Sequence, residues 1–181
     1  MINSYFFINA LTLSRVLFAV IIFYLLSTNG NYILALILFF GAGLSDYFDG
    51  YLSRKYQKSS QLGEILDPVA DKILLIFVFF GLAINLSSYL IGFMGSIIIS
   101  REIWVSALRD FNSRNNNLGA TKVTYLAKVK TTIQFLTILV YLIGLASNIM
   151  LLIIIADILL ILSSVITLYT GYKYTLNTFN N

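Results

Sequence analysis

Hydrophobic runs separated by short polar stretches extend along the whole chain. A helix needs about 20 mostly apolar residues to cross the hydrocarbon core of a bilayer, and six runs come close to this length. They lie near residues 5–27, 31–48, 66–85, 88–110, 127–146 and 149–171. The pattern predicts an all-α polytopic membrane protein in which six transmembrane helices form a single domain, residues 1–181.

The first run begins with polar residues about one helical turn apart, at Asn9, Thr12 and Arg15. This spacing predicts a short amphipathic amino-terminal stretch at the membrane interface, which leads into the first span. In the alternative interpretation, Asn9 and Thr12 only satisfy local backbone groups. The run continues past the usual length of a signal peptide without a small-residue cleavage site, so we expect it to be retained as a helix.

Charged residues are unevenly distributed among the connections between the runs. The connections at residues 27–31, 85–88 and 147–148 carry no charge, whereas those at residues 49–65 and 111–126 carry several Arg and Lys residues. Because basic loops remain in the cytoplasm, this asymmetry predicts that both termini face the cytoplasm, an N-in and C-in topology. Most ionisable residues then lie near that face. Asp157, inside the last run, is the exception, and the sequence gives it no role.

The composition excludes several classes of protein and of chemistry. With 59% hydrophobic and 11% charged residues, the chain does not have the composition of a soluble globular domain. It contains no Cys and no His, which excludes thiol nucleophiles, disulfides and imidazole general bases. Acid and base catalysis therefore falls to Asp, Glu, Lys or Tyr.

Two pairs of aspartates stand at helical spacing beside hydrophobic runs. Asp46 and Asp49 are three residues apart, and Asp67 and Asp71 are four apart, so each pair lies on one face of its own helix. Four carboxylates brought together at a membrane edge repel one another unless cations compensate them. Oxygen ligands favour hard divalent cations such as Mg²⁺ or Mn²⁺ over zinc. The pairs therefore predict a divalent cation site.

Residues near these aspartates are suited to a phosphate-bearing ligand. Gly50 follows Asp49 directly, and Gly63 precedes Asp67 by four residues, so both leave room for a bulky group near the backbone. Arg54 is positioned to bind a phosphate oxygen. A single Asp at a membrane edge is often only a helix cap or a solvated helix end. The complete set indicates a metal-bound diphosphate site.

The stretch from Asp46 to Asp71 resembles the signature of the CDP-alcohol phosphatidyltransferases, D-x-x-D-G-x-x-A-R-x8-G-x3-D-x3-D. Every spacing agrees, and the single departure is Ser53, where the family usually has Ala. The resemblance implies a six-helix membrane enzyme, usually a homodimer, that transfers a phosphatidyl group from a CDP-linked lipid to an alcohol and releases CMP. It implies no nucleic acid partner.

The same resemblance implies roles for individual residues. Two divalent cations, Mg²⁺ or Mn²⁺, would be held by Asp46, Asp49, Asp67 and Asp71, and Asp71 would also be the general base. The proline that often precedes the family's amino-terminal Asn is Ile8 here. Contacts to the CDP-lipid are expected from Asn9, Thr12, Asp49, Gly50, Ser53, Arg54, Ser60, Gly63 and Asp67.

Basic residues of the fourth and fifth runs form a second candidate site. Arg101 and Arg109 are eight residues apart and lie on one helix face, and Lys128 and Lys130 open the fifth run. Cations at a membrane edge are often only topology markers. Arg101 and its neighbour Glu102, however, lie inside an apolar run, where a charge is costly unless it is used. The cluster therefore indicates a binding site for the phosphate of a second, anionic substrate.

These basic segments resemble those of the phosphatidylglycerophosphate synthases within the family, as does the segment at residues 66–72; Ala127 replaces their usual Gly. This likeness implies CDP-diacylglycerol and sn-glycerol 3-phosphate as substrates. It also implies the inner, cytoplasmic membrane of a bacterium, with the active site at the cytoplasmic face. Cardiolipin synthases share parts of these segments.

Other functions stay open at this point. The same chemistry could act on another acceptor, as in a cardiolipin synthase that uses phosphatidylglycerol or in a phosphatidylinositol phosphate synthase. A divalent cation transporter also binds ions through acidic residues on membrane helices, although its site usually lies near the bilayer midplane. A scaffold without catalytic activity does not explain the spacing of the carboxylates, glycines and arginine.

Overall fold

The structure is a computed structural model that describes residues 2–56, 61–115, 117, 119, 121 and 125–180. Of residues 2–9, 46–56 and 61–65 it describes only the backbone.

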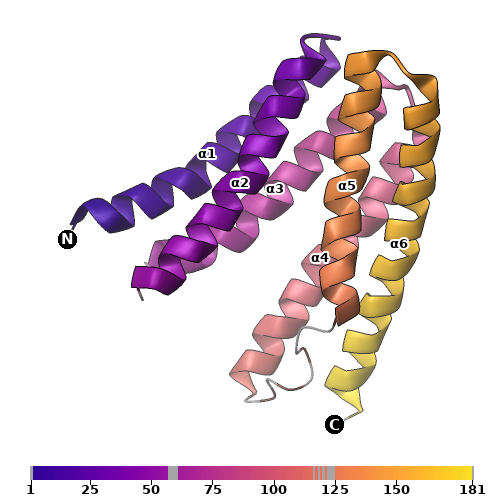
Figure 1. The fold of residues 1–181 in the computed structure, drawn as a ribbon. Helices are drawn as coiled ribbons and strands as arrows, with labels where there is room; N and C mark the ends of the chain where they lie inside the picture. Colours follow the sequence, from indigo (N-terminus) through magenta and orange to yellow (C-terminus); the bar gives the residue numbers. More distant parts are fainter. Residues whose placement is uncertain are drawn as a thin grey trace.

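The chain folds into six helices that run up and down in one bundle (Figure 1). Their bounds are α1 Ile2–Ser27, α2 Tyr32–Tyr56, α3 Gln61–Asn85, α4 Tyr89–Arg114, α5 Tyr125–Ser147 and α6 Met150–Phe179. The described residues contain no strand. Each of the six hydrophobic runs lies almost entirely within one helix, so the prediction of an all-α fold is confirmed.

The described parts of the helices differ in how well they suit a membrane. Four stretches are long and apolar enough to cross one: Ala10–Ser27, Tyr89–Arg114, Tyr125–Ser147 and Met150–Phe179. The apolar described part of α2, Tyr32–Ser45, is shorter. The described part of α3 begins with the charged residues Asp67, Asp71 and Lys72, which lower its hydropathy. The four long apolar helices indicate a membrane protein. That α2 and α3 also cross the membrane remains a prediction.

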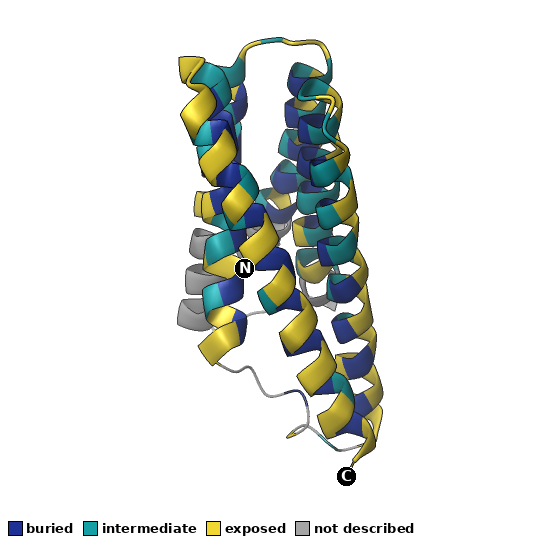
Figure 2. Ribbon diagram, turned by 90° about the vertical axis from the view of Figure 1, so that its right-hand side faces the viewer, coloured by how far each residue is buried: buried dark blue, intermediate teal, exposed yellow. Residues whose placement is uncertain are grey.

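Apolar residues form both the inside and the outside of the bundle. Buried positions follow each helix as stripes that face its neighbours (Figure 2). Ile22 of α1, Phe39 of α2 and Val78 of α3 belong to the main core. On the outside, large side chains such as Ile37 and Leu151 are about 60% exposed or more, which would be unfavourable over such an area in water. An apolar outer surface of this kind is typical of a membrane protein.

Three tight turns join α1 to α2, α3 to α4 and α5 to α6 at one end of the bundle (Figure 1). Each uses a small polar residue with positive φ: Asn29 at 49°, Ser87 at 47° and Asn148 at 55°. The Asn85 amide ties two of these turns together, since it donates to the Leu26 carbonyl at 2.8 Å. Helices α2 and α4 end, and helices α3 and α5 begin, toward the other end of the bundle (Figure 1).

Asp157 of α6 has a partner on the neighbouring helix. The Tyr141 hydroxyl of α5 donates a hydrogen bond of 2.5 Å to its carboxylate. Farther along the same helix pair, the Gln134 amide donates to the Thr167 hydroxyl at 3.2 Å. An intramembrane acid is often functional, and among the described side chains this one joins α5 to α6 through Tyr141.

Candidate active site

One group of functional side chains lies where α1 meets the first turns of α3. Asp67 and Asp71, one helical turn apart, are 39% and 53% exposed. The Thr12 hydroxyl donates to Asp67 at 2.6 Å. Arg15, whose side chain is 1% exposed, reaches Asp71 at 2.5 Å and Asp67 at 3.3 Å. Helix α1 therefore holds both carboxylates on one side, while the other side stays accessible.

The sequence predicted part of this arrangement. Thr12 and Asp67 were both expected in the CDP-lipid site, and they are hydrogen-bonded. The role of Arg15 was missed, because it was considered only as part of the amino-terminal polar pattern. A charged residue inside an apolar span usually has a buried partner, and this signal pointed to an acid on another helix. The spacing alone did not identify Asp67 and Asp71 as the partners.

Most of the other predicted residues lie outside the side chains that the structure describes. Their arrangement around Asp67 and Asp71 therefore remains a prediction. These residues are Asn9, Asp46, Asp49, Gly50, Ser53, Arg54, Ser60 and Gly63.

The donor atoms of Asp67 and Asp71 suit a hard divalent cation. Both offer carboxylate oxygens, and both are accessible from outside the bundle. Within the described residues there is no group of three or more acidic, His or Cys side chains around one point. The sequence predicts that Asp46 and Asp49, whose side chains lie outside the described part of the structure, complete the ligand set.

A second group of functional side chains lies between α4, α5 and α6 and contains two buried cations. Arg101 is 7% exposed and Lys130 is 3% exposed. The Glu102 carboxylate accepts a hydrogen bond from Arg101 at 3.2 Å and forms a close ion pair with Lys130. Arg101 also donates to the Thr170 hydroxyl at 2.8 Å. Residues from three helices thus form one polar cluster inside the bundle.

The Tyr174 ring of α6 brings a third cation to this cluster. The guanidinium carbons of Arg101 and Arg109 lie 5.7 and 6.0 Å from the ring centroid, within cation–π distance. Arg109 is exposed, unlike Arg101. Arg101, Arg109 and Lys130, predicted to act together, are therefore gathered around Glu102 and Tyr174. Lys128 is exposed, and among the described residues its side chain makes no contact with them.

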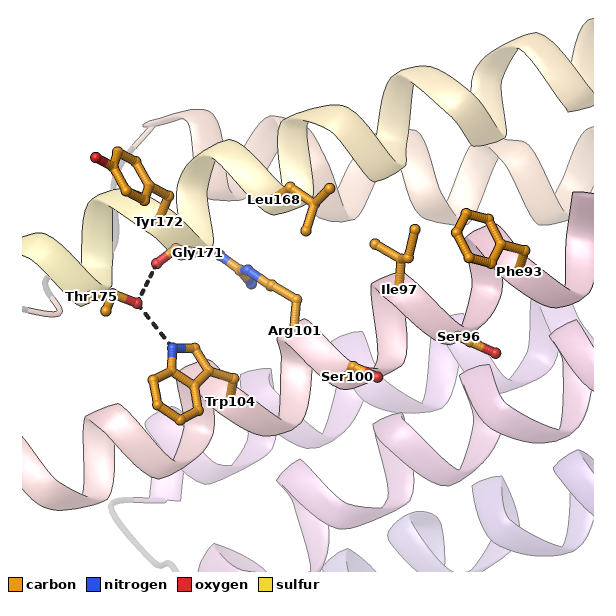
Figure 3. Close-up of a pocket in the computed structure, with 10 residues that line it drawn as sticks. All are labelled: Phe93, Ser96, Ile97, Ser100, Arg101, Trp104, Leu168, Gly171, Tyr172 and Thr175. Carbon is orange, nitrogen blue, oxygen red and sulfur yellow. Dashed lines mark hydrogen bonds between the residues drawn. The ribbon is translucent and has the colours of Figure 1, made fainter.

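Helices α4 and α6 approach closely where Arg101 crosses between them. Figure 3 shows this side chain reaching past Gly171, with Trp104 and Thr175 hydrogen-bonded beside it at 2.9 Å. A Cβ atom at position 171 would lie 2.9 Å from Cγ of Arg101 and 3.2 Å from its Nε. A side chain at position 171 would therefore force the buried arginine to move.

A cavity of about 310 Å³ connects the region of the aspartates with α5. Arg15 and Asp71 line one part of it, and Thr131 and Gln134 of α5 line another. Lys130 directly precedes Thr131 in the chain. Lys130 does not line the cavity, but it lies one helical turn before Gln134 on the same face of α5. The cavity therefore reaches from the aspartates to the helix that carries one cation of the second group.

Comparison with known proteins identifies the family to which the chain belongs. Residues 6–169 match the family model described as CDP-alcohol phosphatidyltransferase. The chain is 38% identical over 131 residues to a Haemophilus influenzae protein named CDP-diacylglycerol–glycerol-3-phosphate 3-phosphatidyltransferase, covering 71% of this chain and 70% of that protein. Proteins of the same name from Escherichia coli strain K12 and Shigella flexneri serotype 5b are each 37% identical over 131 residues, covering 71% of both chains.

Proposed function

Because the chain belongs to the CDP-alcohol phosphatidyltransferase family, we propose that it transfers the phosphatidyl group of CDP-diacylglycerol to sn-glycerol 3-phosphate. The products are phosphatidylglycerophosphate and CMP. The observation that supports this choice of acceptor is the gathering of Arg101, Arg109 and Lys130 around Glu102 and Tyr174. A cationic cluster of this kind is suited to the phosphate of the acceptor.

The aspartate group, which consists of Asp67 and Asp71 with Thr12 and Arg15, binds the CDP-lipid. Members of this family generally use divalent cations, and we propose that Asp46, Asp49, Asp67 and Asp71 hold two, Mg²⁺ or Mn²⁺. Bound there, these ions would neutralise charge on the diphosphate and on the departing CMP. Thr12 and Arg15 support this site from α1 by holding Asp67 and Asp71 in place.

The cationic group, the cluster described above around Glu102 and Tyr174, binds the acceptor. Arg101, Arg109 and Lys130 bind its phosphate, with Lys128 as a further contact from the membrane edge. Its C1 hydroxyl then points toward Asp71, which accepts the hydroxyl proton. The C1 oxygen forms a bond to the phosphorus of the phosphatidyl group, and the bond from that phosphorus to CMP breaks. This single displacement needs no covalent enzyme intermediate, in keeping with a chain that has no Cys or His.

We further propose how the bundle lies in its membrane. All six helices cross it, both termini face the cytoplasm, and the active site opens at the cytoplasmic face of a bacterial inner membrane. The uncharged turns lie at one end of the bundle, and the basic residues Arg54, Lys55 and Arg114 belong to the last turns of α2 and α4 at the other, which supports this orientation. The protein acts on membrane lipid as a homodimer, as the family resemblance implies.

Incubation of the purified protein with CDP-diacylglycerol, Mg²⁺ and a panel of acceptors tests the proposed function. The panel contains glycerol 3-phosphate, inositol phosphate, serine and phosphatidylglycerol, and CMP release is measured. We expect rapid release with glycerol 3-phosphate alone. Preference for phosphatidylglycerol or inositol phosphate would instead identify the other acceptor classes. Uptake of divalent cations into vesicles without any CDP-lipid would favour a transporter.

A further inference from the structure

Among the described residues, Glu102 is the one acidic side chain of the cationic cluster. Its carboxylate is 22% exposed and lies between Arg101 on its own helix and Lys130 on α5. Both cations contact the same oxygen, Oε1. A single carboxylate oxygen therefore joins two cations that belong to different helices, α4 and α5.

The two cations depend on Glu102 to different degrees. Arg101 is also held from α6, by the Thr170 hydroxyl and by the Tyr174 ring. In the part of the chain that the structure describes, Glu102 is the one side chain that binds the Lys130 ammonium. Because Lys130 is 3% exposed, water offers it little compensation. Glu102 therefore decides where the Lys130 ammonium points.

The net charge of the cluster matches a particular kind of anion. Among the described residues of the cluster, Arg101, Arg109 and Lys130 carry three positive charges and Glu102 carries one negative charge, so these four residues have a net charge of +2, while Lys128 lies outside them at the membrane edge. A phosphate monoester carries about −1.5 to −2 near pH 7. Without Glu102, the cluster would carry an excess of positive charge, and two buried cations would repel each other.

We propose that Glu102 is a positioning residue that makes this site selective for a phosphate monoester dianion. It holds the Lys130 ammonium beside the Arg101 guanidinium, so that both can bind one phosphate together with Arg109. It also reduces the charge of the cluster to that of the ligand. This role rests on the proposed function, since it concerns the phosphate of the acceptor.

The substitution Glu102→Gln tests this role, because it removes the charge and keeps the shape of the side chain. We expect KM for glycerol 3-phosphate to rise about tenfold or more, which corresponds to about 1.4 kcal/mol of lost binding. KM for CDP-diacylglycerol should change less than about twofold. Asp110→Asn is the matched control, because it breaks an exposed ion pair with Arg114 on the same helix and should leave both KM values unchanged.

Glu102→Asp provides a second variant that retains the charge. Because the negative charge remains, Glu102→Asp should keep most of the affinity for glycerol 3-phosphate despite its shorter side chain. If Glu102 had only a structural role, its substitution would lower stability and change both KM values equally. An unchanged KM for glycerol 3-phosphate in Glu102→Gln, or a lower one, would overturn the proposal.

The charge match can also be tested on the unmodified protein, so that the result does not depend on the folding of a variant. Methyl phosphate, a dianion near pH 7.5, should compete with glycerol 3-phosphate at least about tenfold more strongly than the monoanion dimethyl phosphate. Equal inhibition by the two would contradict the charge match. If the unmodified protein releases no CMP with glycerol 3-phosphate, the proposed function fails. If it does and Glu102→Gln behaves like the unmodified protein, only the role of Glu102 fails.

Discussion

The aspartate group and the cationic group differ in how they hold their charges. Asp67 and Asp71 are partly exposed and are held by Thr12 and Arg15 of α1. Arg101 and Lys130 are almost fully buried and are enclosed by side chains from α4, α5 and α6. An open site suits ions and a large lipid headgroup that must enter and leave. An enclosed site suits recognition of one small anion.

The two groups also differ in how they are built from the sequence. The aspartate motif occupies one continuous stretch of residues 46–71, whereas the cationic cluster draws on residues as far apart as Arg101 and Tyr174. Chemistry that depends on the first group should therefore be separable from acceptor binding that depends on the second. Each variant below tests this separation with steady-state kinetics for both substrates.

Asp71→Asn should have the largest effect. Removal of a general base typically costs about 10²–10⁴-fold in rate, so we expect turnover to fall at least about a thousandfold. Binding of CDP-diacylglycerol, measured by equilibrium titration, should change little because the side chain keeps its shape. Near-normal turnover in this variant would refute the assignment of Asp71 as the base.

Lys130→Gln should have the next largest effect, on the acceptor side. Loss of a buried, charge-assisted contact to phosphate typically costs about 2–5 kcal/mol, so KM for glycerol 3-phosphate should rise about a hundredfold. The same substitution at the exposed Lys128 should have a much smaller effect. Comparable losses at both positions would show that burial does not distinguish the two lysines.

Arg15→Gln should affect the aspartate group and leave the cationic group unchanged. Because Arg15 orients both Asp67 and Asp71, kcat/KM for CDP-diacylglycerol should fall about tenfold, while KM for glycerol 3-phosphate should stay the same. Arg114→Gln, which removes a fully solvated ion pair with Asp110, serves as the control. A selective rise in KM for glycerol 3-phosphate would contradict the division into two groups.

Gly171→Ala should have the smallest effect. The added Cβ would lie 2.9 Å from Arg101 Cγ, so Arg101 must move by a few tenths of an ångström or more. We expect KM for glycerol 3-phosphate to rise about three- to fivefold, since about 1 kcal/mol corresponds to a factor of five. Gly41→Ala is the control, because its Cβ would meet Phe18 at an ordinary distance of 3.9 Å. An unchanged KM in Gly171→Ala would show that Arg101 tolerates the shift.

The helices could be predicted from the sequence more closely than their ends. Hydrophobicity stops at the membrane surface, but backbone hydrogen bonding continues, so α2 extends to Tyr56 and α6 to Phe179, beyond the predicted runs. Residues of the cluster were harder to identify. Tyr174 and Thr170 belong to a segment that reads as an ordinary apolar span or its tail, and only the fold brings them to Arg101.

Periodicity explains the different positions of the two lysines. Lys128 and Lys130 were predicted to act together because they are close in sequence. Residues two apart on a helix point about 200° apart, so one is buried when the other is exposed. The pairing of Glu102 with Lys130 could not be predicted, because it depends on how α4 packs relative to α5.

The central claim is that both groups serve one transfer reaction. Its most direct test uses isotopically labelled glycerol 3-phosphate and CDP-diacylglycerol in liposomes that contain the unmodified protein, with CMP and labelled phosphatidylglycerophosphate measured together. We predict one CMP for each labelled lipid, with neither formed by Asp71→Asn. CMP release without labelled lipid, or no reaction of the unmodified protein with glycerol 3-phosphate, would contradict the claim.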